Sequence, residues 1–447
     1  MVEEKSILKT ILFHNFSKWD VKQFFMKQIK SSFPITFLSE LLNEETEKKK
    51  LSKFPNEDFG ILGISNEEGM FDAYTEKGKN INQPYKIIKN DFIAYNPYRV
   101  NVGSIGIKKE HLKNEYISNA YVVFSTKENL LADYLFLLMH TNKFNQLIRD
   151  NTTGSVRQTL SFENLGKIAI PVPSLPEQKA IIQKYQDTIS KAESIEKEAE
   201  KLILFKENYI QNILGIPLID DTIQSTLLSY SKFSDLLEKW TISPLQSEIN
   251  EKLRLSKYRL DKISSLNCVT RSWKKKEYKE KKFDYIEIGG INPETEEISS
   301  VQLEVSKAPS RATQLVYKGD LIFGMTRPYL KKFAIVDTAH DGFICSSGFQ
   351  VIQPSENYNL HFILELLKSN VCISQFKEAM TGALYPALNA EQLGNIRIPL
   401  PPLPVQNEIV EHINQIKAQV KDLRQQAKEL REKAKLEFER SVFEKND

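Results

Sequence analysis

Arginine, lysine and tyrosine side chains gather in two short segments of this 447-residue sequence. The segment NPYRV occupies 96–100, and MTRPYLKK occupies 325–332. Arginine can donate two hydrogen bonds to guanine in the major groove of DNA, and asparagine can bond adenine in the same way. The candidate base-reading residues are Asn96, Tyr98, Arg99, Arg327, Tyr329, Lys331 and Lys332. A hairpin in which arginine simply stacks on tyrosine is the alternative interpretation of both segments.

A third basic segment, at 271–282, carries seven lysines and arginines against two glutamates, with Trp273 and Tyr278 among them. Lysines bind phosphates by releasing counterions, which adds affinity without reading the base sequence. We therefore predict that this segment contacts a nucleic-acid backbone, and an ordinary solvated loop is the alternative. The candidate residues are Arg271, Lys274 and Lys275.

Two glycine turns offer further polar groups. The residues after Gly154 and Gly382 that could contact bases from the tips of these turns are Ser155, Arg157, Gln158 and Tyr385. Polar groups that project from rigid strands suit base reading.

Motifs for catalysis are missing from the sequence. It contains no phosphate-binding GxxxxGK(S/T) loop, dinucleotide-binding GxGxxG, HExxH or Ser-His-Asp pattern. Residues 96–98 (Asn-Pro-Tyr) faintly resemble the catalytic loop of amino-methyltransferases, but the second proline and the cofactor-binding glycine motif are absent. The three cysteines are far apart and form no CxxC pair, which argues against disulfides and zinc. We predict a chain with no catalytic residue, no metal and no cofactor of its own.

Charge and hydropathy limit the surfaces that the protein can bind and the compartment in which it is expected. The net charge is only +3, so a surface that binds nucleic acid must be local. The amino terminus lacks the basic start and apolar run of a signal peptide, and no stretch is apolar enough to span a membrane. We expect a soluble, cytoplasmic protein.

A tandem repeat must position the candidate residues. Residues 154–178 and 382–406 match without a gap, so that each residue has a counterpart 228 positions later, as Gly154 has in Gly382. At the same spacing, Arg99 corresponds to Arg327. Outside the matched pieces, 44–50 and 271–282 have no counterpart in the other copy, which we interpret as divergent surface loops. A duplicated chain suggests a function that is carried out in duplicate.

Each copy ends in a short strand, a proline elbow and a long helix. In the first copy, Ser174 and Glu177 are spaced for a capping box, which Val405 breaks in the second copy. The first helix should end near Asn212, because Gly215 and Pro217 follow. At about 1.5 Å per residue, such a helix is longer than a small domain is wide.

A heptad pattern of apolar residues predicts that the two long helices pack together as an antiparallel coiled coil, although a solvated arm is the alternative for a single helix. The seam residues are Tyr185, Ala192, Ile195, Ala199, Leu202, Ile409, Ile413, Ile416, Val420, Leu423 and Leu430.

The predicted fold class is α+β, because short alternating strands mix with helical patches before each elbow. Two tandem recognition domains are joined by two long antiparallel helices with a pseudo-twofold internal repeat. The predicted domains are 1–170 and 215–398, and each is followed by an elbow and spacer helix, at 171–214 and 399–447.

With these features, the chain resembles the specificity subunit of a Type I restriction-modification enzyme. The resemblance rests on the elbows IPVPSLPEQ and IPLPPLPVQ and on the two long helices. It implies that each recognition domain reads one half of a split site on double-stranded DNA, and that the helices fix the unread gap. It also implies two partner methyltransferase subunits that bind S-adenosylmethionine and methylate adenine N6, and separate motor-nuclease subunits that cleave DNA.

Two other functions stay open at this stage. A coiled-coil adaptor would bind proteins or peptides rather than DNA. A self-sufficient methyltransferase would methylate adenine without partners. Footprints in two separated patches, with steeply salt-dependent binding, would favour the specificity subunit.

Overall fold

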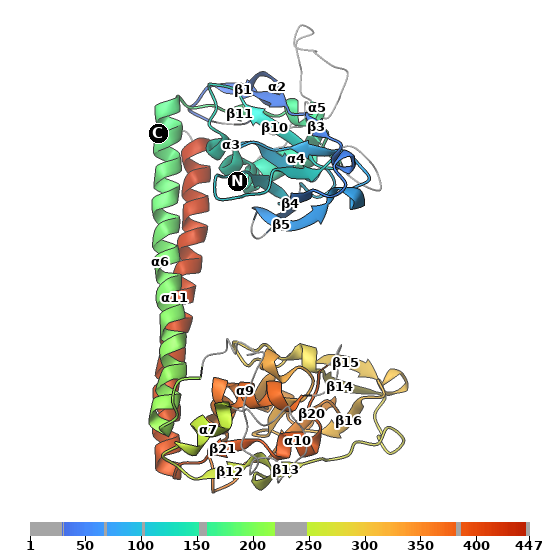
Figure 1. The fold of residues 1–447 in the computed structure, drawn as a ribbon, viewed down its shortest axis with the longest axis vertical. Coiled ribbons are helices and arrows are strands. Elements are labelled where there is room, and N and C mark those ends of the chain that lie inside the picture. Colours follow the sequence, from blue (N-terminus) through green and yellow to red (C-terminus); the bar gives the residue numbers. More distant parts are fainter. Residues whose placement is uncertain are drawn as a thin grey trace, which may run out of the picture. The chain divides into compact units, whose positions relative to one another are not determined.

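The computed structural model describes residues 29, 31–66, 69–100, 103–151, 159–219, 248–380 and 386–443. The chain divides into two compact units. The first unit is Met1–Ile195 with Gln425–Asp447, and the second is Glu196–Arg424. Each unit holds one mixed helix-and-sheet domain and part of both long helices, α6 (Leu175–Leu214) and α11 (Leu403–Phe443) (Figure 1).

The domain of the first unit contains two larger sheets and a two-stranded ribbon. The four-stranded sheet has the order β2 (Leu42–Glu44), β10 (Val122–Thr126), β7 (Ile93–Tyr95), β8 (Ile105–Ile107). The five-stranded sheet has the order β3 (Lys48–Lys49), β6 (Tyr85–Ile87), β9 (Tyr116–Ser118), β4 (Asp58–Ser65), β5 (Gly69–Lys77). The ribbon pairs β1 (Ile35–Phe37) with β11 (Ala169–Pro171). The helices are α2 (Leu38–Leu41), α3 (Ala132–Met139), α4 (Asn142–Asn151) and α5 (Phe162–Gly166).

The domain of the second unit repeats this plan. One four-stranded sheet has the order β13 (Cys268–Val269), β20 (Phe349–Ile352), β17 (Leu321–Gly324), β18 (Phe333–Ile335). The other has the order β15 (Val301–Glu304), β14 (Lys282–Ile286), β19 (Ile344–Ser346), β16 (Ala312–Leu315). The ribbon pairs β12 (Leu260–Lys262) with β21 (Arg397–Pro399). The helices are α7 (Glu248–Arg254), α8 (Leu360–Lys368), α9 (Asn370–Ala379) and α10 (Ala390–Gly394).

The repeat predicted from the sequence extends to the register of the strands. Tyr95 pairs with Ile105 in the first domain, and the residues 228 positions later, Phe323 and Phe333, pair in the second. The four aromatic and aliphatic side chains are fully buried in their cores. Two repeated domains of mixed helix and sheet are therefore confirmed.

A buried glutamine fixes each elbow to its domain. Gln178 is completely buried; its amide oxygen accepts from the Leu131 backbone at 2.8 Å, and its amide nitrogen donates to Pro173 O at 2.8 Å. The equivalent Gln406 makes the same two bonds, from the Asn359 backbone and to Pro401 O, each at 2.8 Å. The chain thus builds the same joint twice between a globular domain and the start of a long helix.

The predicted capping box at the first elbow forms in part. The Glu177 carboxylate accepts from the Ser174 backbone at 2.8 Å and from its hydroxyl at 2.7 Å. These bonds lower the pKa of Glu177. The serine hydroxyl is therefore used by the glutamate rather than by the helix backbone.

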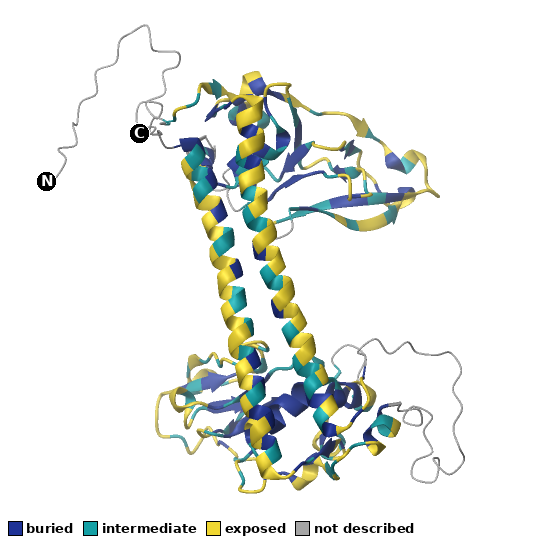
Figure 2. Ribbon diagram, turned by 90° about the vertical axis from the view of Figure 1, so that its left-hand side faces the viewer, coloured by how far each residue is buried: buried dark blue, intermediate teal, exposed yellow. Residues whose placement is uncertain are grey.

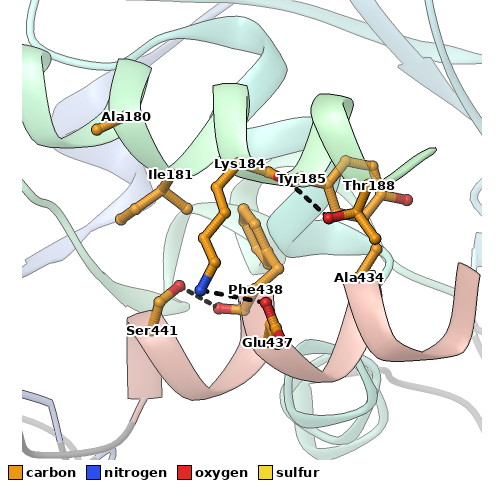
Figure 3. Close-up of a pocket in the computed structure, with 9 residues that line it drawn as sticks. All are labelled: Ala180, Ile181, Lys184, Tyr185, Thr188, Ala434, Glu437, Phe438 and Ser441. Atoms are coloured by element: carbon orange, nitrogen blue, oxygen red, sulfur yellow. Dashed lines mark hydrogen bonds and ion pairs between the residues drawn. The ribbon is translucent and has the colours of Figure 1, made fainter. Parts of the chain in front are cut away.

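The two long helices contact each other within each unit and run antiparallel there. In the first unit, Lys184 of α6 lies 3.1 Å from Glu437 of α11, and the rings of Tyr185 and Phe438 are 6.1 Å apart. These residues line a cavity of about 210 Å³ between the helices (Figure 3). In the second unit, Tyr209 lies 4.2 Å from His412, measured between ring centroids.

None of the predicted seam residues is exposed, and five of the eleven are buried. Figure 2 shows that buried and exposed positions alternate along both helices. The buried seam residues are Ala192, Ala199, Ile409, Ile413 and Ile416, and those of intermediate exposure are Tyr185, Ile195, Leu202, Val420, Leu423 and Leu430. Helix α6 ends at Leu214, two residues beyond the prediction, and Gly215 follows with a φ of +70°.

The prediction that 44–50 and 271–282 lack counterparts is wrong. Lys48 of the edge strand β3 pairs with Lys86, and Ser272 forms a bridge with Gln314 at the equivalent place in the other domain. Sequence matching missed this because the spacing between the copies falls from 228 to 224 residues here. Among the described residues, no helix combines the length and apolarity needed to cross a membrane. The predicted domain boundaries stay a prediction.

Candidate nucleic-acid interface

The basic turn of the first domain joins β7 to β8. Asn96 bends the chain there, because its side-chain oxygen accepts from the Tyr98 backbone at 3.0 Å and its carbonyl accepts from the Arg99 backbone at 3.0 Å. Tyr98 is 60% exposed, and Arg99 is also exposed. Both side chains are thus held at the surface by a fixed turn.

The matching turn of the second domain joins β17 to β18 and has a more constrained backbone. Arg327 and Lys331 have φ angles of +48° and +55°, in the left-handed region that non-glycine residues rarely adopt. They flank the short helix Pro328–Leu330. Tyr329 is half-buried against the main core, and the ammonium of Lys332 donates to Ile291 O. Tyr329 therefore packs in the protein, whereas Tyr98 faces outward.

The segments that follow the loops after Gly154 and Gly382 form backbone hydrogen bonds with these turns. In the first domain, the Leu160 backbone donates to Pro97 O at 3.1 Å. In the second, the Arg327 backbone donates to Pro386 O at 2.8 Å, and Leu388 donates to Met325 O at 3.0 Å. The structure thus brings the ends of the two predicted reading segments together in each domain. The loop candidates themselves, Ser155, Arg157, Gln158 and Tyr385, lie outside the described residues.

The lysine-rich loop presents its charges but not its aromatic rings. Lys274 and Lys275 are exposed; their ammonium groups reach Glu277 at 3.0 Å and Ser306 O at 2.8 Å. Trp273 is only 7% exposed and packs with Phe283 and Tyr278. Trp273 is therefore part of a small core, and the loop suits phosphates better than base stacking.

Arg271 anchors this loop from inside. Its guanidinium makes two hydrogen bonds to Asp320, a residue only 2% exposed. The hydrogen bond to Asp320 raises the pKa of Arg271. The guanidinium also lies 5.0 Å from the centre of the Tyr317 ring. The role that the structure gives Arg271 is to hold the loop, which the sequence pattern did not indicate.

Comparison with known proteins identifies the family. The model of the Type I restriction modification DNA specificity domain matches residues 31–203 and again residues 255–432. These matches cover more than half of the chain and fall once in each copy of the repeat. The chain belongs to this family. The resemblance inferred from the elbows and helices is thereby confirmed.

Two specificity subunits are similar to this chain along most of its length. The Type I restriction enzyme EcoDI specificity subunit of Escherichia coli is 24% identical over 339 residues, which are 71% of this chain and 69% of that one. The MjaVIII specificity subunit of Methanocaldococcus jannaschii is 22% identical over 417 residues, 86% of this chain and 91% of that one. A chain from a structural study of type I R-M complex assembly and conformational transition has a TM-score of 0.56 at 14% identity. That structure covers 93% of this chain and 98% of its own, and shows a shared fold.

This family member holds its second domain on the long helices through a buried charge network. Glu365 of α8 is 4% exposed; it lies 2.9 Å from Lys206 of α6 and also pairs with Lys417 of α11. The Glu296 carboxylate forms ion pairs with the ammonium groups of Lys368 and Lys417, each at an N–O distance of 2.7 Å. Burial raises the pKa of Glu365, but Lys206 and Lys417 outweigh burial and hold that pKa at about 2. Burial lowers the pKa of Lys368 despite Glu296.

The first specificity domain and the helix positions that correspond to this network carry apolar residues. The counterparts of Glu365, Lys417 and Lys206 in the other copy are Leu137, Ile189 and Ala434. Leu137 packs against the core of the first domain, and Ala434 is 2% exposed. The charge network of the second half thus has no charged counterpart at these three positions of the first half. Within the part of the chain that the structure describes, no cluster of three His, Cys, Asp or Glu could hold a metal ion.

Proposed function

We propose that this chain is the DNA-recognition subunit of a Type I restriction-modification complex, and that each domain reads one half of a bipartite site. The observation that carries the proposal is the duplicated basic turn, with Arg99 and Arg327 at equivalent positions in two domains of a DNA specificity family. Arginine on a fixed turn can bond guanine, while nearby lysines hold phosphates.

In this proposal, the long helices form one antiparallel coiled coil that sets the unread gap between the half-sites. The buried seam of α6 and α11 and their antiparallel contacts within each unit support this arrangement. The helices also provide the surface on which methyltransferase subunits dock. Half-sites read from one face of the duplex would lie about one helical turn apart, roughly 34–36 Å.

The chemistry of the complex belongs to partner subunits. Two modification subunits would bind S-adenosylmethionine and methylate adenine N6, and motor-nuclease subunits would cleave unmodified DNA. The specificity chain contributes recognition and geometry, in the cytoplasm.

Footprinting tests this function directly. The chain, assembled with its methyltransferase subunits, should protect two patches of duplex separated by an unprotected gap, with affinity that falls steeply as salt rises. A coiled-coil adaptor would give no protection under these conditions. Adenine methylation by the purified chain alone would instead indicate a self-sufficient methyltransferase, and we expect none.

A further inference from the structure

The basic loop of the second domain has a structural counterpart in the first. At the edge of the five-stranded sheet, Lys48 pairs with Lys86, and at the equivalent edge in the second domain Ser272 bridges Gln314. The next strands inward also correspond, because Tyr85 pairs with Ser118 as Ala312 pairs with Ser346. Lys48 therefore occupies the position of Ser272.

The other ends of the two loops correspond as well. Ile61 pairs in parallel with Tyr116, and Tyr285 pairs in parallel with Ile344. Tyr116 and Ile344 are equivalent in the repeat, so Ile61 is equivalent to Tyr285. The loops 48–58 and 272–282 thus have the same length and lie in the same place in their domains.

The inner sides of the loops are anchored by aromatic packing. Lys49 takes the position of Trp273, and its ammonium lies 4.9 Å from the ring centre of Phe54 and 5.5 Å from that of Phe59. The aromatic residues around Trp273, Tyr278 and Phe283, occupy the matching positions. Each loop therefore has a fixed inner side, and Leu51, which is fully buried, adds to it in the first domain.

The outer sides of the loops carry the same charge on unrelated sequences. Lys48, Lys50 and Lys53 are exposed in the first domain, as Lys274, Lys275 and Lys276 are in the second. Glu47 is the acidic residue next to the first loop. Its carboxylate forms an ion pair with the ammonium of Lys89, at 3.4 Å, and Lys89 is not one of the three loop lysines. Three ammonium groups on a fixed backbone form a surface for phosphates, which attract lysine regardless of base sequence.

We propose that the loop 48–53 is a second backbone-binding site, whose lysines hold DNA phosphates beside the half-site that the first domain reads. The loop 274–276 does the same for the second domain. This inference rests on the proposed function, since it assumes that both domains bind DNA. It assigns three residues that the sequence pattern had left without a role.

Salt-dependent binding separates the two proposals. The wild-type chain, a Lys48→Ala/Lys50→Ala/Lys53→Ala variant and a Lys274→Ala/Lys275→Ala/Lys276→Ala variant are each assembled with the methyltransferase subunits and titrated with a duplex that carries the bipartite site. A variant with Lys127, Lys257 and Lys262 changed to Ala is the matched control for charge, because these exposed lysines lie outside the lysine loops, the basic turns and both long helices. The slope of log affinity against log salt concentration should become shallower by about 2.7 when three phosphate contacts are lost. Raising the salt from 50 to 200 mM should therefore weaken the variant about 40-fold less than it weakens the wild type.

Lysine acetylation with mass spectrometry gives a second readout. DNA should protect Lys48, Lys50 and Lys53, and should leave Lys127, Lys257 and Lys262 as reactive as they are in the DNA-free complex. If only the 274–276 variant changes the slope, and DNA leaves Lys48, Lys50 and Lys53 reactive, this inference is overturned while the proposed function stands. If the wild-type complex binds the duplex with no salt dependence and no protection, the proposed function itself fails.

Discussion

At the residue scale, the two turns that we propose to read DNA share an arginine but differ in the backbone conformation of that arginine. Arg327 sits in a left-handed backbone conformation that a hydrogen bond from its own N–H to Pro386 O supports, whereas Arg99 lies in a turn closed by Asn96. A backbone conformation of this kind costs on the order of 1–3 kcal/mol and persists only where the surroundings enforce it. The backbone from which the Arg327 side chain projects is therefore held in a defined conformation.

Arg327→Ala should weaken recognition of one half-site only. The loss of a bidentate contact should cost about 1–3 kcal/mol and relax sequence preference at that position. Competition binding of the assembled complex, with duplexes substituted in one half-site or the other, measures the effect. Arg99→Ala is the matched variant and should affect the opposite half-site. Equal loss at both half-sites in the Arg327→Ala variant would contradict this prediction.

Some of these residues could be predicted from the sequence and others could not. Arg99 and Arg327 could be paired because the spacing of 228 residues holds around them. The match of the lysine loops was hidden by a four-residue change of spacing, and only strand register exposes it. Arg271 looked like one more cation, because its partner Asp320 is 49 residues away and reaches it only through the fold. The burial of Trp273 could not be predicted, because an aromatic residue among lysines in a sequence does not show whether its ring faces the core or the solvent.

At the scale of elements, the joints between domains and helices explain why the elbow motif occurs twice. The prolines and short strands predict stiff elbows. The final glutamine of each motif is explained by its burial and by its hydrogen bonds to two backbone groups. The charge network around Glu365 could not be predicted from the sequence, because Lys206 lies 159 residues from Glu365 and the other copy has apolar residues at the equivalent positions. Long-range polar contacts of this kind leave no periodic pattern in a sequence.

Gln406→Met should destabilise the second joint. The Asn359 N–H and Pro401 C=O would lose their partner in a buried place, and each unsatisfied group costs about 1–3 kcal/mol. Chemical denaturation of the purified chain should show a lower midpoint for the transition that includes the second domain. Gln415→Met, at an exposed position of the same helix, is the control and should stay within about 0.5 kcal/mol of wild type. A Gln406→Met variant as stable as this control would show that the joint contributes nothing.

Glu365→Gln should destabilise the attachment of the second domain to the helices at neutral pH. Removing one partner of a buried ion pair costs about 3–5 kcal/mol, and the cost here should lie toward the lower end, because Lys206 would lose its counter-charge while its side chain is 19% exposed. Denaturant unfolding, with Glu411→Gln on the exposed face of α11 as control, measures the difference. The prediction fails if the two variants unfold at the same denaturant concentration.

The same carboxylate predicts a specific acid sensitivity. The pKa of Glu365 is lowered in the folded state to about 2, from an ordinary value of 4.5. A lowered pKa means that the carboxylate stabilises the fold above pH 4.5, and that this contribution is lost as pH falls toward 2. Stability measured from pH 6 downward should therefore fall less steeply in Glu365→Gln than in wild type. Parallel curves for the two proteins would remove Glu365 as a source of acid sensitivity.

At the scale of the whole molecule, duplication gives one chain two domains of the same plan whose outward-facing loops differ. The strand registers, the buried glutamines and the helix starts are conserved between the copies, while the loops that face outward differ in sequence. This division suits a protein in which recognition changes and geometry does not. If the paired helices set the gap, their length should be the variable that determines it.

Shortening both helices by one heptad tests this relation. Deletion of 189–195 from α6 together with 426–432 from α11 keeps the seam in phase, because a seven-residue repeat is removed from each helix. The deletion removes about 10 Å of helix at 1.5 Å per residue, or roughly three base pairs of duplex. We expect the preferred gap to shorten by that amount, as measured by selection from duplexes with randomised gap lengths, while the two half-site sequences stay the same. A control that lacks the heptad in α6 alone should lose affinity for every gap, since its seam no longer matches. An unchanged gap in the double deletion would mean that partner subunits, and not these helices, determine the distance.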